Sequence, residues 1–118
     1  FTNASSFKQP LNKWNVSKVM IMNGMFSETR FNQPLDNWNV SNVTSMWCMF
    51  EGASSFNQPL NKWNVSNVTS MEMMFRLAKS FNQPLNNWDV SNVETMSRMF
   101  EFAASFDGRH APWYGHDE

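Results

Sequence analysis

The sequence predicts an α/β solenoid of about four and a half units of about 25 residues, each with one helix and one short extended strand. Two observations lead to this fold class: columns of Phe and Trp recur at a fixed period, and apolar side chains within each unit follow helical spacing. A fixed period is typical of stacked arrays in which each unit contacts only its neighbours. We expect right-handed coiling, because crossovers between parallel strands are almost always right-handed.

The period is set by aromatic residues. One column, with spacings of 24, 25, 25 and 25 residues, contains Phe7, Phe31, Phe56, Phe81 and Phe106. A second column, interpreted as a structural ladder in the core, contains Trp14, Trp38, Trp63, Trp88 and Trp113. The short first interval is a deletion of one residue within 27–30.

The helix is predicted from apolar spacing within one unit. The residues that share one face of such a helix are Val43, Met46, Met49, Phe50 and Ala53. Ser41 is the expected N-cap, because its hydroxyl can accept from the unpaired N–H groups of the first turn. Helices are therefore expected near 18–28, 42–52, 67–77 and 92–102.

The extended strand is predicted in the rest of the unit. Pro34 and its equivalents stop any helix before the next Leu, and the following Trp-Asn-Val, at 38–40 for example, alternates like a very short strand. One helix and one strand per unit is the plan of a leucine-rich-repeat-like fold. Asn39 and its equivalents are expected to bond their own chain two residues on.

The chain divides at about residue 106. Residues 1–106 are predicted to form the repeat solenoid, with a partial first unit that indicates a fragment of a longer array. Residues 107–118 are predicted to be a divergent C-terminal cap or tail, because Asp107-Gly108-Arg109-His110 replaces the usual Asn-Gln-Pro-Leu.

Composition argues against several functions. A net charge of −1 offers no basic face for nucleic acid, and no apolar run is long enough for a membrane span. The single Cys48 excludes an internal disulfide, and no catalytic motif or cofactor signature is present, so we expect no enzyme and no cofactor. The residues that could clasp a metal loosely, although a frayed terminus explains them as well, are His110, His116, Asp117 and Glu118.

A surface for partners is predicted on the outer helical face. Its columns change from unit to unit, and the large apolar candidates for protein binding are Trp47, Met73, Leu77 and Phe102. The alternative is that Trp47 folds inward against the next unit. A neighbouring column that alternates in charge contains Glu51, Arg76 and Glu101.

Two segments carry a family resemblance. The stretches Ala-Ser-Ser-Phe-Asn-Gln-Pro-Leu at 53–60 and Trp-Asn-Val-Ser-Asn-Val-Thr-Ser-Met at 63–71, followed by Met-Phe at 74–75, closely resemble the BspA-like surface-protein repeat. This is the repeat of mycoplasma-type lipoproteins, also called the palindromic amphipathic repeat. The resemblance implies an extracellular, often lipid-anchored protein of bacteria or unicellular eukaryotes, with no catalytic residues.

Two functions remain open from sequence. One is a cell-surface module for protein binding or adhesion, with host extracellular matrix as an expected partner and end-to-end or side-by-side self-association as a further expectation. The other is a structural spacer or variable surface antigen without a dedicated ligand. A clustered apolar patch would favour binding, whereas an evenly polar exterior would favour the spacer.

Overall fold

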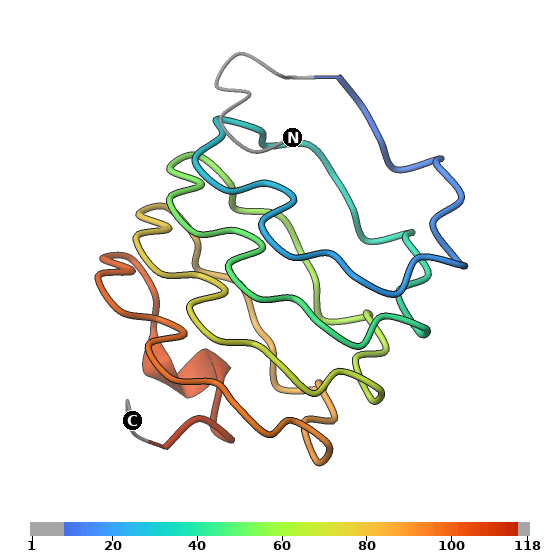
Figure 1. Cartoon of the computed structure of the whole chain (residues 1–118). Coiled ribbons are helices and arrows are strands. Elements are labelled where there is room, and N and C mark those ends of the chain that lie inside the picture. The colour runs from blue at the N-terminus through green and yellow to red at the C-terminus, as the bar shows by residue number, and fades with distance from the viewer. Residues whose placement is uncertain (1–8, 116–118) are drawn as a thin grey trace.

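Successive repeat units lie on one another as coils of irregular backbone (Figure 1). This computed structural model describes residues 9–115, so Phe7 lies outside the described residues. Within 9–115 the only helix is the 3-10 helix η1, Gly108–His110. Pairing between coils is parallel and consists of isolated bridges that join Ile21, Ser45, Ser70 and Thr95 in succession.

The predicted α/β solenoid is wrong. None of the segments 18–28, 42–52, 67–77 and 92–102 is an α-helix, and the Trp-Asn-Val segments form no strands. The molecule is a compact body of 34 × 30 × 19 Å built from turns. The leucine-rich-repeat-like assignment is overturned with it, and right-handed coiling loses its basis because no helix connects parallel strands.

Backbone hydrogen bonding explains why no helix forms. Alternate N–H groups leave their own coil: Met46 donates to the carbonyl of Ser70 (2.9 Å), and Phe50 donates to that of Met74 (2.8 Å). Residues between them close tight turns, as Met49 does by donating to the carbonyl of Met46 (3.2 Å). A helix of this length is marginal on its own, whereas a stacked neighbour offers partners along the whole segment.

Left-handed backbone residues also interrupt any helix. Two residues in each turn segment have φ between 54° and 69°. The first column contains Gly24, Cys48, Met73 and Arg98, and the second contains Glu28, Gly52, Leu77 and Phe102. An α-helix cannot continue through such residues, because its right-handed backbone requires negative φ.

The helical spacing nevertheless identified the side chains that face inward. Those with 0% exposure in the second full coil are Val43, Met46, Met49, Phe50 and Ala53. The Phe50 ring belongs to a column that continues through the stack, since its centroid lies 5.3 Å from that of Phe75 with an interplanar angle of 4°. The apolar spacing therefore matches the inward face, while the backbone that produces it is a pair of turns.

The tryptophan column is buried over its middle. Trp38, Trp63 and Trp88 are 3–4% exposed, whereas Trp14 is 53% exposed and Trp113 is half-buried. The indole Nε1 of Trp63 donates to the carbonyl of Leu35 at 2.9 Å, and this bond recurs at 2.8–2.9 Å for Trp38, Trp88 and Trp113. These four indoles are thus tied to the preceding coil, and Trp63, Trp88 and Trp113 also stack on one another.

Asparagine side chains satisfy the loops between coils. Asn39 Oδ1 accepts from the N–H of Ser41 at 3.0 Å, which confirms the predicted bond two residues on. The Ser41 hydroxyl donates to the same oxygen at 2.6 Å, so its predicted role as a helix cap is wrong. Asn57 Oδ1 instead accepts from the next coil, from the N–H of Asn82 at 2.9 Å.

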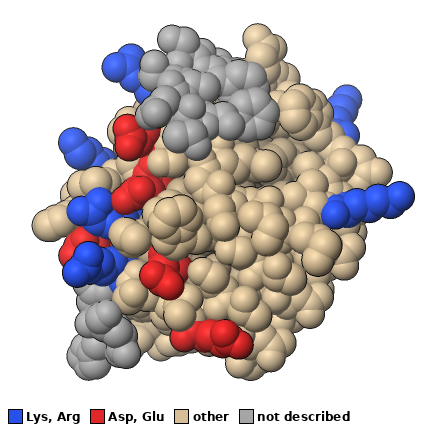
Figure 2. Space-filling model, viewed as in Figure 1, with Lys and Arg blue, Asp and Glu red and all other residues tan. Residues whose placement is uncertain are grey.

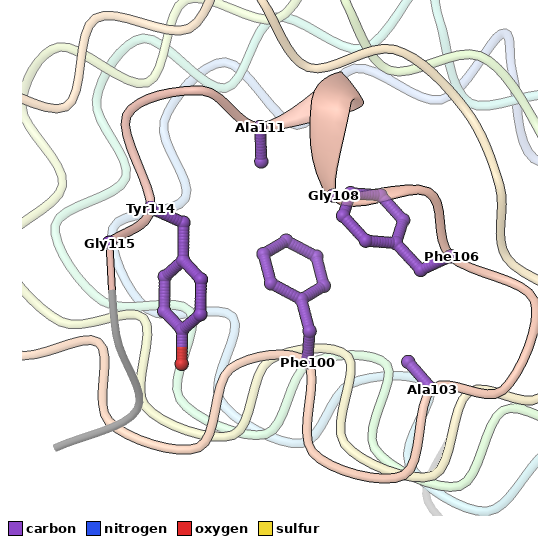
Figure 3. Close-up of a pocket in the computed structure, with 7 residues that line it drawn as sticks. All are labelled: Phe100, Ala103, Phe106, Gly108, Ala111, Tyr114 and Gly115. Carbon is purple, nitrogen blue, oxygen red and sulfur yellow. The ribbon is translucent and has the colours of Figure 1, made fainter.

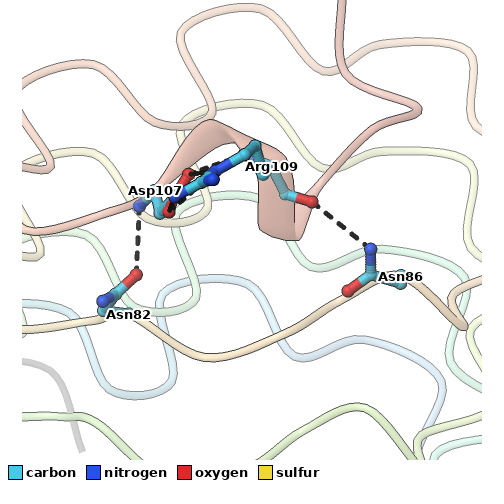
Figure 4. Close-up of polar contacts among 4 residues, drawn as sticks. All are labelled: Asn82, Asn86, Asp107 and Arg109. Carbon is cyan, nitrogen blue, oxygen red and sulfur yellow. Dashed lines mark hydrogen bonds and ion pairs between the residues drawn. The ribbon is translucent and has the colours of Figure 1, made fainter.

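The C-terminal end is fastened by polar contacts around η1 (Figure 4). The Asp107 N–H donates to Asn82 Oδ1 (3.0 Å), and Asn86 Nδ2 donates to the Arg109 carbonyl (3.3 Å). The Asp107 carboxylate caps η1 by accepting from the Arg109 N–H (2.9 Å). The predicted cap at 107–118 is described only as far as residue 115.

Candidate protein-binding surface

The four predicted partner-binding residues all lie on turn segments at the side of the stack. These segments are 47–52, 72–77 and 97–102. Phe102 is 65% exposed and Trp47 is 44% exposed, while Met73 and Leu77 are half-buried. Trp47 therefore does not fold inward, which was the alternative placement.

The structure brings two of the four into one column. The N–H of Leu77 donates to the Glu101 carbonyl at 2.9 Å, which places Phe102 beside Leu77 on the next coil. Met73 occupies the other left-handed column, and its N–H donates to Ser97 (3.0 Å). Trp47 begins its turn segment at the far end from that column, so it projects separately.

A charged row runs beside Leu77 and Phe102. Arg76 Nη1 lies 3.0 Å from Glu51 Oε2, and its Nε lies 2.7 Å from Glu101 Oε1. Hydrogen bonds to Glu101 and then Glu51 raise the pKa of Arg76 above its ordinary value. The guanidinium carbon also lies 5.8 Å from the Phe102 ring centroid, within cation–π range. The row thus holds Arg76 against the exposed ring.

Backbone strain coincides with this surface. Met73, Leu77 and Phe102 have φ of 54°, 61° and 59°. An L residue with a side chain costs about 1–2 kcal/mol in this region, whereas Gly, present as Gly52 in the column of Leu77, does not. Sequence reasoning missed this feature, although the available signal was one Gly in each column, Gly24 in the first and Gly52 in the second.

Cys48 shares a column with Met73 but is buried. Burial, with a contribution from the neighbouring Glu51, raises the pKa of its thiol to about 12. The thiol is therefore neutral at physiological pH, and a neutral thiol is a poor nucleophile.

The remaining surface is mostly uncharged on the side shown in Figure 2, where most charged groups lie along the left margin, with further Lys or Arg at the right edge and an acidic group near the bottom. Across residues 9–115, no group of three or more His, Cys, Asp or Glu could hold a metal ion. The His110 ring meets Phe106 edge-on at 6.1 Å, while His116, Asp117 and Glu118 lie outside the described residues. No helix in the part of the chain that the structure describes is long and apolar enough to cross a membrane.

The repeat, the stacked coils and the aromatic columns define a mycoplasma-type repeat protein. The chain belongs to the family described as Mycoplasma protein of unknown function, DUF285, whose model matches residues 1–113. No curated protein and no solved structure gave a significant match.

Proposed function

We propose that this chain is a non-catalytic, BspA-like cell-surface module that binds another protein through the side of the stack. The binding surface consists of Trp47, Met73, Leu77 and Phe102. Its expected partner is a protein of the host extracellular matrix, which places the module outside the cell.

The observation that carries the proposal is Phe102. It combines 65% exposure with a left-handed backbone at φ 59°, and its neighbour Leu77 is also left-handed at φ 61°. A large apolar side chain in this position is unfavourable for stability for two reasons. Its apolar surface stays in contact with water, and its left-handed backbone is strained. Such outliers gather at functional sites, where a second requirement keeps them.

The chemistry of this surface suits protein recognition. Exposed aromatic residues beside an arginine are typical of the residues that contribute most to protein interfaces. The hydrogen bonds that Arg76 donates to Glu51 and Glu101 hold its side chain in one position, so less side-chain entropy is lost on binding.

The test is the double variant Leu77→Asp with Phe102→Asp. We expect it to stay folded by circular dichroism and to lose at least tenfold in affinity for whichever immobilised matrix protein binds the unchanged chain in surface plasmon resonance. The matched control is Asn37→Asp with Asn87→Asp, two exposed positions away from the binding surface. Equal binding by both double variants would contradict the proposal.

A structural spacer or variable antigen is the second candidate. It is favoured by the position of Trp47, which stands at the far end of its turn segment from the Leu77 column, so the apolar residues do not form one cluster. If the unchanged chain bound none of the immobilised matrix proteins tested by surface plasmon resonance, that result would favour this candidate.

A further inference from the structure

The last complete coil presents an open edge, defined as residues 94–102, which include the turn segment 97–102. In the coil before it, the backbone N–H groups that point towards the next coil all donate hydrogen bonds to it. The N–H of Met71 donates to the Thr95 carbonyl at 2.8 Å, and that of Phe75 donates to the Met99 carbonyl at 2.9 Å. Within residues 9–115 the equivalent groups of the open edge make no hydrogen bond. They are the N–H groups of Met96, Phe100 and Phe102 and the carbonyl of Glu94.

Apolar side chains lose burial at the same edge. Val68, Met71 and Phe75 are 0% exposed because a coil lies on each side of them. Their equivalents in the last complete coil are half-buried, and these are Val93, Met96 and Phe100. The unused backbone groups and the uncovered side chains therefore coincide, as they do at the edge of a sheet that can accept another strand.

A pocket adjoins the open edge (Figure 3). Its volume is about 270 Å³, and its apolar lining includes Phe100, Phe106, Ala103 and Ala111. Figure 3 shows the Tyr114 ring beside that of Phe100, which it meets edge-on with centroids 5.2 Å apart. A cavity of about 150 Å³ already holds a benzene ring, so this one has room for an aromatic side chain.

The coils themselves show what fits such an edge. In each inner coil the segment that covers its neighbour has apolar residues spaced Val-x-x-Met-x-x-Met-Phe, as at 68–75. Its alternate carbonyls accept the N–H groups of the preceding coil, and its Phe ring stacks on the preceding Phe ring.

We propose that the open edge binds an extended peptide segment of a partner with Val-x-x-Met-x-x-Met-Phe spacing. Its carbonyls accept from Met96, Phe100 and Phe102, and its Phe enters the pocket. Such strand addition gives affinity through the main chain and specificity through alternate side chains. A whole second copy fits less well, because residues 106–113 already lie over the preceding coil, where Phe106 stacks on Phe81 and Trp113 stacks on Trp88.

The proposal concerns a different surface from the side of the stack, although Phe102 contributes to both. Its backbone N–H belongs to the open edge, while its side chain belongs to the proposed binding surface. The variants that test the open edge therefore leave Phe102 unchanged, so that the two proposals fail independently.

The probe is a fluorescent synthetic peptide that copies residues 66–78 of this chain, added to the full 118-residue chain and followed by anisotropy. We expect saturable binding that weakens at least tenfold when the peptide has Asp in place of Phe75, and also when its sequence is scrambled. The proposal would be overturned if the scrambled peptide bound equally well. It would also be overturned if the peptide showed no binding at a concentration of about 1 mM, which corresponds to a very weak specific complex.

Amide hydrogen exchange locates the peptide on the unmodified chain. We expect exchange at Met96, Phe100 and Phe102 to slow at least tenfold on saturation, with no change at Met20 on the first coil. Protection confined to the first coil or to 47–52 would contradict the open edge. Protection already complete without peptide, together with a doubled mass, would show a second copy as occupant and overturn the choice of a peptide.

A chain variant gives a further check. Met96→Asp in the half-buried edge should weaken peptide binding at least tenfold, whereas Met20→Asp, at a position 58% exposed on the opposite end, should not. If Met96→Asp fails to fold, the peptide variants and the exchange measurement still decide the question. A folded Met96→Asp chain that binds as tightly as the unchanged chain would contradict the proposal.

Discussion

At the scale of single residues, the fold depends on positions where a residue with a side chain adopts the left-handed backbone conformation that favours Gly. Among residues 9–115, six residues other than Gly have positive φ, and Glu28, Leu77 and Phe102 are three of them. The first short unit shows a local adjustment as well: the hydroxyl of buried Thr29 donates to the Phe26 carbonyl at 3.0 Å and accepts from the Phe31 N–H at 3.4 Å. One side chain thus supplies bonds where the other units have an extra residue.

Replacement of Glu28 tests the backbone cost directly. Glu28 is exposed with φ 56°, so Glu28→Gly should stabilise the chain by about 1 kcal/mol relative to Glu28→Ala in urea unfolding. The reciprocal change Gly52→Ala, at φ 69° and with its new Cβ 3.1 Å from Glu28 Cγ, should destabilise by a similar amount. Equal stability of the Gly and Ala variants would mean that these residues are not left-handed.

Asp107 gives the C-terminal end a dependence on pH. Hydrogen bonds from the Arg109 side chain and then from its N–H lower the pKa of Asp107 to about 2. A lowered folded-state pKa contributes stability that is present above the ordinary value of 3.8 and is lost as pH falls from about 4 towards 2. A carboxyl NMR titration should show a midpoint near 2, and Arg109→Ala should move it up. An unchanged midpoint in the variant would contradict the assigned cause.

At the scale of elements, apolar spacing predicted the inward face but not the backbone that makes it. Val43, Met46 and Phe50 point inward as a helix would place them, because two successive turns return the chain to the same side. Periodicity alone cannot separate the two, since the deciding partners lie about 25 residues away. The same limit explains the candidate site: the exposed positions were found, while the left-handed backbone of Leu77 was not.

The asparagine side chains that bond one coil to the next can be tested by single substitutions. Asn57 Oδ1 accepts from the Asn82 N–H at 2.9 Å and from Gln83 Nε2 at 3.1 Å. Asn57→Ala should therefore cost about 0.5–1.5 kcal/mol in thermal or urea unfolding. Asn87→Ala is the matched control, because the Asn87 side chain is exposed and makes no hydrogen bond to residues 9–115, and it should be nearly neutral.

At the scale of the whole molecule, stability comes from stacking through the Phe columns. Phe75 is 0% exposed and stacks on both Phe50 and Phe100, at 5.3 Å and 5.6 Å. Each coil therefore needs a neighbour on both faces, which is why the units repeat.

Truncation of Phe75 tests this dependence. Phe75→Ala should destabilise by about 3–5 kcal/mol, because it removes a buried ring between two others. Phe102→Ala should cost less than about 1 kcal/mol, since that ring is 65% exposed. Similar losses for the two variants in chemical unfolding would show that the ring column does not hold the coils together.

The most direct measurement of coil-to-coil bonding is NMR on the labelled chain. Cross-hydrogen-bond couplings and nuclear Overhauser effects should join Met46 to Ser70 and Phe50 to Met74, with alternate amides in 46–52 reaching the next coil. Couplings from each amide to the carbonyl four residues earlier, with the far-UV circular dichroism of a helix, would contradict the account.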